Sequence, residues 1–307
     1  MGMPILILGE SGTGKTTSLR NFKEGEIALV NVTGKALPFR GNFEMLKNTT
    51  DASKILRFMR ETKSKRIIID DCQYIMSFQY MRRIKENGWE KFNELQSDFF
   101  NIIDAVSSLP DDVLVYFLSH LETKDDGRQK IKTIGKMLDE KITIEGMFTT
   151  VLKTHVSDGK YYFLTQNSGS DTVKSPLGMF ADFAIDNDLK YVDEKIRNYY
   201  QIGEYRSDEE IAKADEVASR PEIEKGNGGR VRKAARPRPA GKTDEAADLV
   251  EQLKFKFDAS EQPAEKPTEK PAEKSTEEAP VEKTVRRTRK VRVAAPVADI
   301  TDEDIPF

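Results

Sequence analysis

The sequence is poor in residues that bind transition metals and has no long apolar run. It contains one cysteine, Cys72, and two histidines, His120 and His155, among 307 residues. A single thiol favours a reducing compartment, and so few soft ligands do not provide a zinc or iron–sulfur site. No run approaches the ~18 apolar residues of a membrane-spanning helix, and no signal region precedes the first predicted strand. We therefore expect a cytoplasmic protein that does not enter a membrane.

The most informative motif is Gly-Glu-Ser-Gly-Thr-Gly-Lys-Thr at residues 9–16, which follows the apolar run 5–8. It satisfies the P-loop pattern G-x-x-x-x-G-K-[ST] in the required order of strand, loop and helix, with the helix expected to begin at Lys15. Glycines let successive N–H groups face phosphate oxygens, while the Lys15 ammonium would reach the β- and γ-phosphates and the Thr16 hydroxyl would bind Mg²⁺. The motif predicts ATP and Mg²⁺ as cofactors. The expected nucleotide contacts are Gly9, Glu10, Ser11, Gly12, Thr13, Gly14, Lys15, Thr16 and Thr17.

An acidic element follows at residues 66–71, Arg-Ile-Ile-Ile-Asp-Asp. Three β-branched residues before a carboxylate predict a buried parallel strand that ends at the phosphate edge of a sheet. We assign Asp70 to Mg²⁺, through water, because Mg²⁺ prefers carboxylates and retains several waters. Asp71 is placed to orient or deprotonate the attacking water. For Asp71 an ordinary Asp-rich turn stays open as the alternative.

A further strand is expected at residues 113–118, with Ser119 and His120 at its tip. A polar residue at this position of a P-loop fold can sense the γ-phosphate, which makes His120 a candidate catalytic residue beside Lys15 and Asp71. A structural or capping histidine is the equal alternative. His155 has no partner pattern and receives no role.

Residues 1–205 have the pattern of an α/β core. Strand 27–32, a helix capped by Asp51 and a helix with apolar residues between 92 and 106 alternate along the chain. Trp89 is expected to anchor the last of these helices to the sheet. Paired strands at 147–156 and 161–166 and a closing helix at 189–200 complete the region. We predict a mainly parallel sheet with a late antiparallel extension.

The pattern changes near residue 206. Residues 206–298 contain two basic blocks, at 230–242 and 283–292, and a Pro/Glu/Lys-rich repeat at 263–274, so the net charge of −3 conceals a strong local segregation of sign. This composition predicts a disordered tether, with one possible short amphipathic helix at 244–257. The basic blocks either contact a polyanion or serve only as solubilising charge.

The last nine residues, 299–307, differ again. They resemble the C-terminal tip of bacterial single-stranded-DNA-binding proteins, which docks on repair and replication enzymes. In such docking a terminal aromatic ring fills an apolar pocket and the acidic residues meet a positive rim. A generic solubilising tail is the alternative. The resemblance rests on Asp302, Glu303, Asp304, Ile305, Pro306 and Phe307.

The first ~200 residues resemble phage-encoded RecA-like P-loop ATPases of the Sak type, which are associated with single-strand annealing and recombination. The resemblance rests on the P-loop, the 66–71 strand, Ser119-His120, and the stretches 135–141, 145–148 and 174–180. It implies a RecA-like P-loop NTPase core that forms homo-oligomers. RecA-like cores generally carry a catalytic acid after the second strand, where this chain has Asn31. Water activation is therefore assigned to Asp71.

A basic segment follows His120. In RecA-like proteins this region contacts DNA or reaches the nucleotide of a neighbouring subunit, and both uses suit cationic side chains. A solvated charged loop is the equal alternative. The candidates for nucleic-acid or trans-acting contacts are Arg128, Lys130, Lys132 and Lys136.

Together these features predict a Mg²⁺-dependent ATPase that handles single-stranded DNA in phage recombination or replication. Its partners would be single-stranded DNA and the host replication and repair proteins that bind SSB tails. One alternative is a nucleotide-gated adaptor that binds those proteins through the tip with little catalytic role. Another is a small-molecule kinase, which would share the P-loop but leave the tether and the tip without a role.

Overall fold

The structure, a computed structural model, describes residues 1–135, 137–221 and 223. Lys136, most of the predicted tether and the whole acidic tip lie outside these residues. The predictions made for residues 224–307 therefore concern a part of the chain that the structure does not describe.

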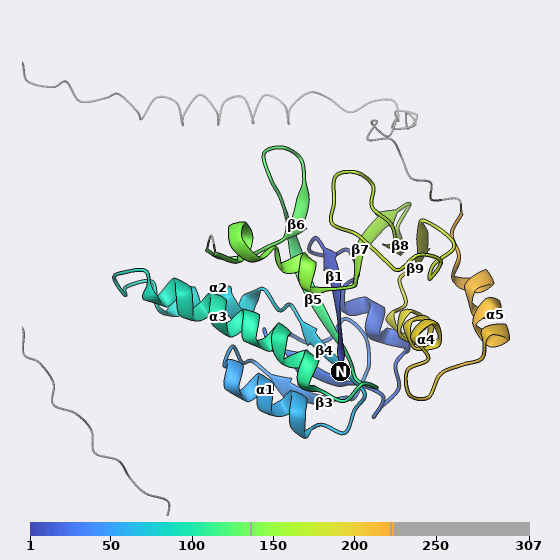
Figure 1. Ribbon diagram of the computed structural model, residues 1–307, viewed down its shortest axis with the longest axis horizontal. Coiled ribbons are helices and arrows are strands. Elements are labelled where there is room, and N and C mark those ends of the chain that lie inside the picture. The colour runs from blue at the N-terminus through green and yellow to red at the C-terminus, as the bar shows by residue number, and fades with distance from the viewer. Residues whose placement is uncertain (136, 222, 224–307) are drawn as a thin grey trace, which may run out of the picture. The chain divides into compact units, whose positions relative to one another are not determined.

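A sheet forms the centre of the described region, with the strand order β3-β2-β4-β5-β1-β7-β8-β9 and with β6 paired to β5 (Figure 1). In this order, all neighbouring strands from β3 through β2, β4, β5 and β1 to β7 pair in parallel. The β7–β8, β8–β9 and β5–β6 pairs are antiparallel. This confirms the α/β class, the mainly parallel sheet and its antiparallel extension. The strands are β1 (Met3–Gly9), β2 (Ala28–Asn31), β3 (Glu44–Lys47), β4 (Arg66–Asp70), β5 (Leu114–Thr123), β6 (Gln129–Ile131), β7 (Thr150–Ser157), β8 (Lys160–Leu164) and β9 (Ala184–Asp186).

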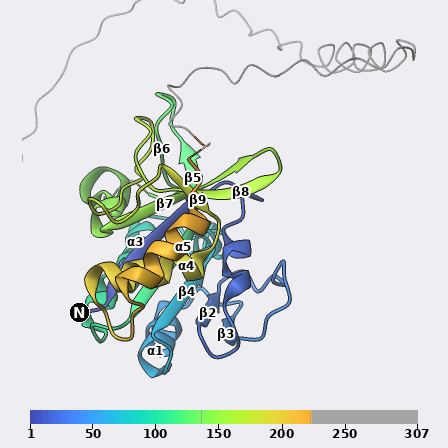
Figure 2. The same ribbon diagram turned by 90° about the vertical axis from the view of Figure 1, so that its right-hand side faces the viewer.

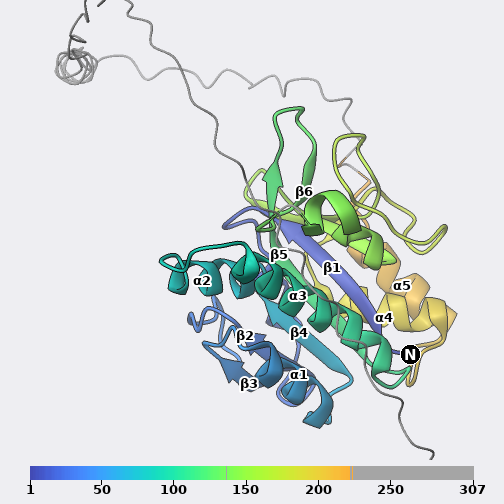
Figure 3. The same cartoon turned by 60° about the vertical axis from the view of Figure 1, so that its left-hand side comes forward.

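Helices cover both faces of the sheet. One face packs on α1 (Ala52–Glu61), α2 (Tyr74–Arg82), α3 (Glu90–Asp104) and the 3-10 turn η2 (Ala105–Ser108), and Figure 3 brings this face forward. The other face packs on the 3-10 helix η1 (Thr16–Asn21), α4 (Leu189–Tyr200) and α5 (Asp208–Ala218), and Figure 2 shows α4 and α5 in front. Two short elements, η3 (Met137–Ile142) and η4 (Ile144–Met147), follow β6. No described helix is long and apolar enough to cross a membrane.

The sheet explains why its central strands are continuous apolar runs. Successive side chains of a strand point to opposite faces, so a strand covered on both sides needs apolar residues at every position. In β4, Ile67 and Ile69 enter the core beneath α1–α3, while Ile68 enters the core beneath α4. All three are at most 1% exposed. The run before Asp70 is therefore a buried central strand, as its composition predicts.

Several local predictions are confirmed, although the bounds of the paired strands β7 and β8 differ by one to three residues from the predicted ones. The Asp51 side chain accepts a hydrogen bond from the Lys54 amide and caps α1. The strands β7 and β8 pair across the turn at 158–159, and the closing helix spans Leu189–Tyr200.

Other local predictions are wrong. Trp89 is 80% exposed and does not anchor α3 to the sheet. The helix after the P-loop is a short 3-10 helix that begins at Thr16. The strand that carries His120 continues to Thr123 instead of ending there.

The folded region also extends beyond the predicted boundary at residue 205. The helix α5 begins with a capping box, in which the Ser207 side chain accepts from the Glu210 amide and the Glu210 carboxylate accepts from the Ser207 amide. Ile211 and Ala218 of this helix are buried. Only two buried apolar side chains attach α5, and this small apolar face explains why composition alone did not reveal it.

Candidate active site

The P-loop has a backbone that only glycine accommodates at several positions. Gly12 and Gly14 have φ values of 78° and 98°, in the left-handed region that disfavours a side chain. A Cβ at Gly9 would lie 1.8 Å from Thr154 Oγ1 on β7, and one at Gly14 would lie 2.9 Å from Tyr161 Cδ1 on β8. The loop is therefore packed closely against the β7–β8 hairpin, an arrangement that the motif does not predict.

The Lys15 side chain contacts the backbone of the P-loop. Its Nζ donates to the carbonyl oxygens of Gly9, at 3.0 Å, and Glu10, at 2.9 Å. Burial lowers the pKa of Lys15, and the opposing charges of Asp71 and Asp70 offset part of that effect. The structure thus places this cation at the centre of the phosphate-binding loop, beside both predicted acids.

Thr16 and Asp70 are in direct contact, although they lie on different elements. The Thr16 Oγ1 donates to both carboxylate oxygens of Asp70, at 3.1 and 3.0 Å. Asp70 is 6% exposed, and burial together with the neighbouring Asp71 raises its pKa to about 7. A cation stabilises the ionised form of a carboxylate that burial disfavours. Hydroxyl and carboxylate oxygens are also ligands that Mg²⁺ binds. The two predicted metal residues therefore fit Mg²⁺ bound with ATP.

Asp71 directly follows the carboxyl end of β4 and meets His120, which lies within the neighbouring strand β5. The Asp71 Oδ1 lies 3.3 Å from His120 Nε2, and Lys35 Nζ lies 3.8 Å from the other carboxylate oxygen. Burial would raise the pKa of Asp71, but the His120 hydrogen bond and the charges of Lys15 and Lys35 outweigh it and hold the pKa below its ordinary value. Asp71 is thus an ionised carboxylate at the edge of the nucleotide pocket. Its φ of 58° shows a strained turn directly after the strand.

Gln73 is a residue of this site that sequence reasoning missed. It is 3% exposed, and its Oε1 accepts a hydrogen bond from the His120 amide at 3.1 Å. The Ser119 hydroxyl donates to the same oxygen at 3.4 Å. Gln73 therefore joins the end of β4 to β5 and holds His120 beside Asp71. No motif marks it, because the contact joins the start of α2 to β5, and these segments are distant in sequence.

Asn31 stands where a RecA-like catalytic acid was expected. Its Oδ1 accepts from the Gly34 amide at 2.8 Å, and its Nδ2 donates to the Lys35 carbonyl at 2.7 Å. Asn31 thus shapes the turn that carries Lys35 to Asp71. Lys35 was also missed, since a lysine in a loop has no sequence signal.

One pocket collects the residues of three predicted motifs: the P-loop, Asp71 and His120. Arg128 and Lys130 do not line it and instead line a separate pocket beside the β5–β6 hairpin. Among the described residues, no group of three His, Cys, Asp or Glu side chains could hold a metal by itself. The residues lining the nucleotide pocket are Ser11, Gly12, Gly14, Lys15, Thr16, Thr17, Lys35, Pro38, Asp71 and His120.

Comparison with protein families matches residues 1–177 to an AAA domain. The chain belongs to this AAA domain family. It is therefore a P-loop ATPase, and AAA P-loop ATPases typically bind ATP with Mg²⁺. The match covers the P-loop, both aspartates and His120, and it ends before α4 and α5.

Two further comparisons add little to the family assignment. No curated protein matches the chain. The X-ray structure of the Legionella pneumophila ATPase DotB is similar at 11% identity and a TM-score of 0.28, over 71% of this chain. The chain spans 62% of the length of DotB.

Proposed function

We propose that the nucleotide pocket hydrolyses ATP with the following division of roles. The P-loop amides and Lys15 would bind the phosphates, and Thr16 and Asp70 would hold Mg²⁺. Bound Mg²⁺ neutralises charge on the phosphate oxygens. Asp71 orients the attacking water and accepts its proton, and His120 contacts the γ-phosphate. The distance of 3.3 Å between His120 Nε2 and Asp71 Oδ1 supports these linked roles, because movement of one side chain then changes the position of the other.

We further propose that this ATPase handles single-stranded DNA in phage recombination or replication, by annealing or strand exchange, as a RecA-like homo-oligomer of the Sak type. The observation that carries this proposal is the continuity of β5. The strand runs past His120 at the nucleotide pocket into the β5–β6 hairpin, which bears Arg128 and Lys130. The Lys132 amide donates to the His120 carbonyl at 3.0 Å. A change in the position of His120 can therefore be transmitted to Arg128, Lys130 and Lys132 through the strand and this hydrogen bond.

The hairpin carries three basic and three acidic residues between Glu122 and Lys130, so its support for contact with phosphates comes from the exposed Arg128 and not from a net positive charge. Arg128 has a side chain that is 74% exposed, and its ion pair with Asp126 at 2.7 Å is exposed as well. Exposed pairs contribute only about 0–1 kcal/mol, so a phosphate can replace the carboxylate at little cost. Lys132 is exposed at the hairpin base. Lys136, the fourth predicted contact, lies outside the described residues.

Binding of a labelled single-stranded oligonucleotide across a salt series tests the DNA proposal. Counterion release makes log affinity fall linearly with log salt, with a slope of roughly −0.7 per phosphate neutralised on a single strand. Reversing the charges at Arg128, Lys130 and Lys132 is expected to weaken binding and flatten the slope. The same number of reversals on α1, at Lys54, Arg57 and Arg60, provides the matched control. Absence of binding at low salt would contradict the proposal.

The second candidate is a nucleotide-gated adaptor that binds host repair or replication enzymes. The sequence from Asp302 to Phe307 favours it, since this segment resembles the tip that such enzymes bind. A peptide of residues 299–307 is expected to displace the tail of a bacterial single-stranded-DNA-binding protein from an enzyme that binds it. A peptide lacking Ile305-Pro306-Phe307 is the control. If the full peptide displaces nothing, the adaptor proposal and the tip assignment both fail.

A further inference from the structure

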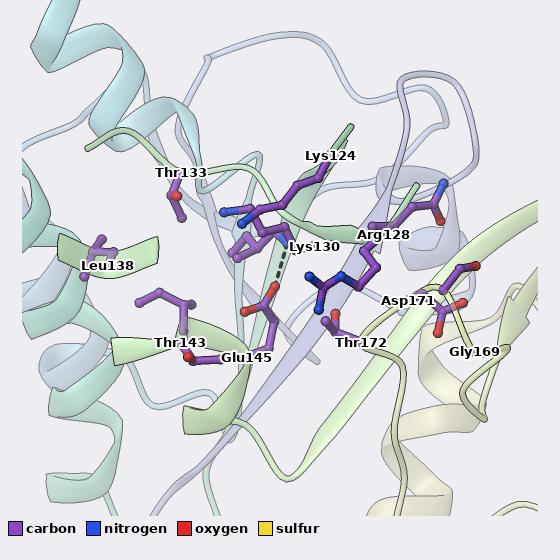
Figure 4. A pocket seen from close by; sticks show the side chains of 14 residues that line it. Lys124, Arg128, Lys130, Thr133, Leu138, Thr143, Glu145, Gly169, Asp171 and Thr172 are labelled. Atoms are coloured by element: carbon purple, nitrogen blue, oxygen red, sulfur yellow. Dashed lines mark hydrogen bonds between the residues drawn. The ribbon is translucent and has the colours of Figure 1, made fainter. Parts of the chain in front are cut away.

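A second pocket lies beside the β5–β6 hairpin and is lined by none of the residues that line the nucleotide pocket. Its volume is ≈ 270 Å³. The hairpin, the segment around 143–145 and the loop at 169–172 form its walls, and Figure 4 shows their side chains directed toward the same hollow. The family assignment gives this pocket no role.

The walls of the pocket are fixed to one another by hydrogen bonds. The Gln129 amide of β6 donates to the Ser170 carbonyl at 2.8 Å. Lys153 Nζ on β7 donates to Gln129 Oε1 at 3.1 Å and to Asp171 Oδ2 at 2.7 Å. The Ile131 amide donates to Glu145 Oε1 at 2.8 Å. These bonds join β6, β7, η4 and the 169–172 loop, so the pocket is a built feature and not a gap between loose segments.

The interior combines an apolar floor with polar groups suited to a base. Ile131, Leu138 and Ile144 are each 1% exposed. The Thr172 Oγ1 is buried and has no hydrogen-bond partner among the described residues. A buried hydroxyl without a partner is costly, and rotation of the Thr172 side chain toward the pocket would let a bound ligand supply the missing hydrogen bond. The apolar floor and this hydroxyl suit a flat heterocycle with polar edges.

The rim differs from the floor in charge. Lys124, Arg128 and Lys130 line the pocket from the hairpin, as Figure 4 shows. Glu145, in contrast, is a buried carboxylate on the opposite wall. Its charge opposes a phosphate deep in the pocket, whereas it accepts hydrogen bonds from exocyclic amino groups of bases. The charge distribution therefore orients a nucleotide with its phosphate at the rim and its base inside.

We propose that this pocket holds one nucleotide unit of a bound single strand, with the base against Ile131, Leu138 and Ile144 and the phosphate at Arg128. This inference rests on the proposed DNA function and adds to it a contact that depends on the base. A free mononucleotide has the same chemistry, and the strand is the source that we propose. The cationic side chains of Lys124, Arg128 and Lys130 at the rim can contact the flanking phosphates, which a free mononucleotide lacks.

The test compares an oligodeoxycytidine with an abasic strand of equal length and charge, using the full-length protein. Removing the bases is expected to weaken binding by wild type roughly tenfold, because a base held on a protein surface contributes on that order. Thr143→Phe places a ring at the mouth of the pocket from an exposed position, and Thr172→Val removes only the hydroxyl. Both variants are expected to reduce the difference between the two strands. Their melting temperatures show whether they fold.

Arg128→Gln separates the rim from the interior. It is expected to weaken both strands by the same factor, since both carry the same phosphates, whereas Arg57→Gln on α1 should change neither. Equal, salt-dependent binding of both strands by wild type would overturn the pocket inference and leave the DNA function standing. Absence of binding to either strand at low salt would overturn both. A third outcome would show that the ligand is a free mononucleotide and not a strand. In that case free deoxycytidine monophosphate binds, Thr143→Phe blocks its binding, and the two strands bind with equal affinity.

Discussion

Asp71, directly after β4, faces His120 on the neighbouring strand β5, with 3.3 Å between Asp71 Oδ1 and His120 Nε2. Gln73 holds His120 in this place by accepting its amide hydrogen bond. Asp71→Asn retains the left-handed backbone, which asparagine tolerates, but removes the basic oxygen. We expect ATP binding to persist and turnover to fall on the order of 100-fold. Nucleotide titration and steady-state turnover measure the two effects separately.

His120 provides a companion test with a control from the same chain. His120→Gln is expected to slow turnover, because it removes the side chain that contacts Asp71. His155→Gln alters the only other histidine, which lies on β7 outside the nucleotide pocket, and should leave turnover unchanged. Equal turnover in both variants would show that His120 is a structural residue of the strand end.

Lys15→Ala is expected to reduce ATP turnover by a factor of about 100 or more, because the variant loses the cation beside the phosphates. Lys15 is 6% exposed and its Nζ donates to the Gly9 and Glu10 carbonyl groups, so a melting curve must show that the variant stays folded. Lys23→Ala, at an exposed position just after η1, is the control. A Lys15→Ala variant with wild-type turnover would remove the P-loop from the mechanism.

Asp70→Asn should separate metal use from nucleotide binding. The amide keeps an acceptor for the Thr16 hydroxyl, whereas it loses the charge that favours Mg²⁺. We expect ATP binding without Mg²⁺ to be retained and the stimulation of turnover by Mg²⁺ to be lost. Isothermal titration with and without Mg²⁺ measures the first effect, and turnover across a Mg²⁺ series measures the second. Wild-type Mg²⁺ dependence in this variant would place the metal at another residue.

The pair of Asp171 and Lys153 predicts a pH-dependent contribution to stability. Burial would raise the pKa of Asp171, but the hydrogen bonds from Lys153 and Ser168 hold it below its ordinary value. A lowered carboxyl pKa stabilises the fold above the unfolded value near 3.9, and the contribution disappears as pH falls through the folded value.

Asp171→Asn is therefore expected to lower the free energy of unfolding by about 1–3 kcal/mol at pH 7. The difference from wild type should shrink in acid. Urea unfolding at several pH values measures it, with the exposed Asp111→Asn as the control. A difference that does not change with pH would indicate lost packing and not a lost charge.

The sequence predicts those parts of the site that lie within a continuous motif. Lys15, Thr16 and Asp70 follow from the P-loop and the apolar strand, since local spacing alone places them. Gln73 and Lys35 could not be predicted, because they act through contacts between segments that only the sheet brings together. Tyr161 and Thr154 pack on P-loop glycines for the same reason.

Errors at the ends of elements have a common physical source. Whether β5 ends at His120 or at Thr123 depends on β6, which pairs with Leu121–Thr123 and has only three residues. The predicted anchoring of α3 by Trp89 is wrong because Trp89 precedes α3 at an exposed position. In both cases tertiary contacts, and not local propensity, decided the outcome.

The most direct test of the central proposal is ATP turnover with and without single-stranded DNA, at low salt and with saturating Mg²⁺. Wild type is expected to turn over ATP faster with the strand, because β5 links His120 to the hairpin that bears Arg128. Charge reversal at Arg128, Lys130 and Lys132 should abolish the stimulation and leave turnover without DNA intact. Turnover that is identical with and without the strand, in a protein that hydrolyses ATP, would contradict the proposed DNA-handling function.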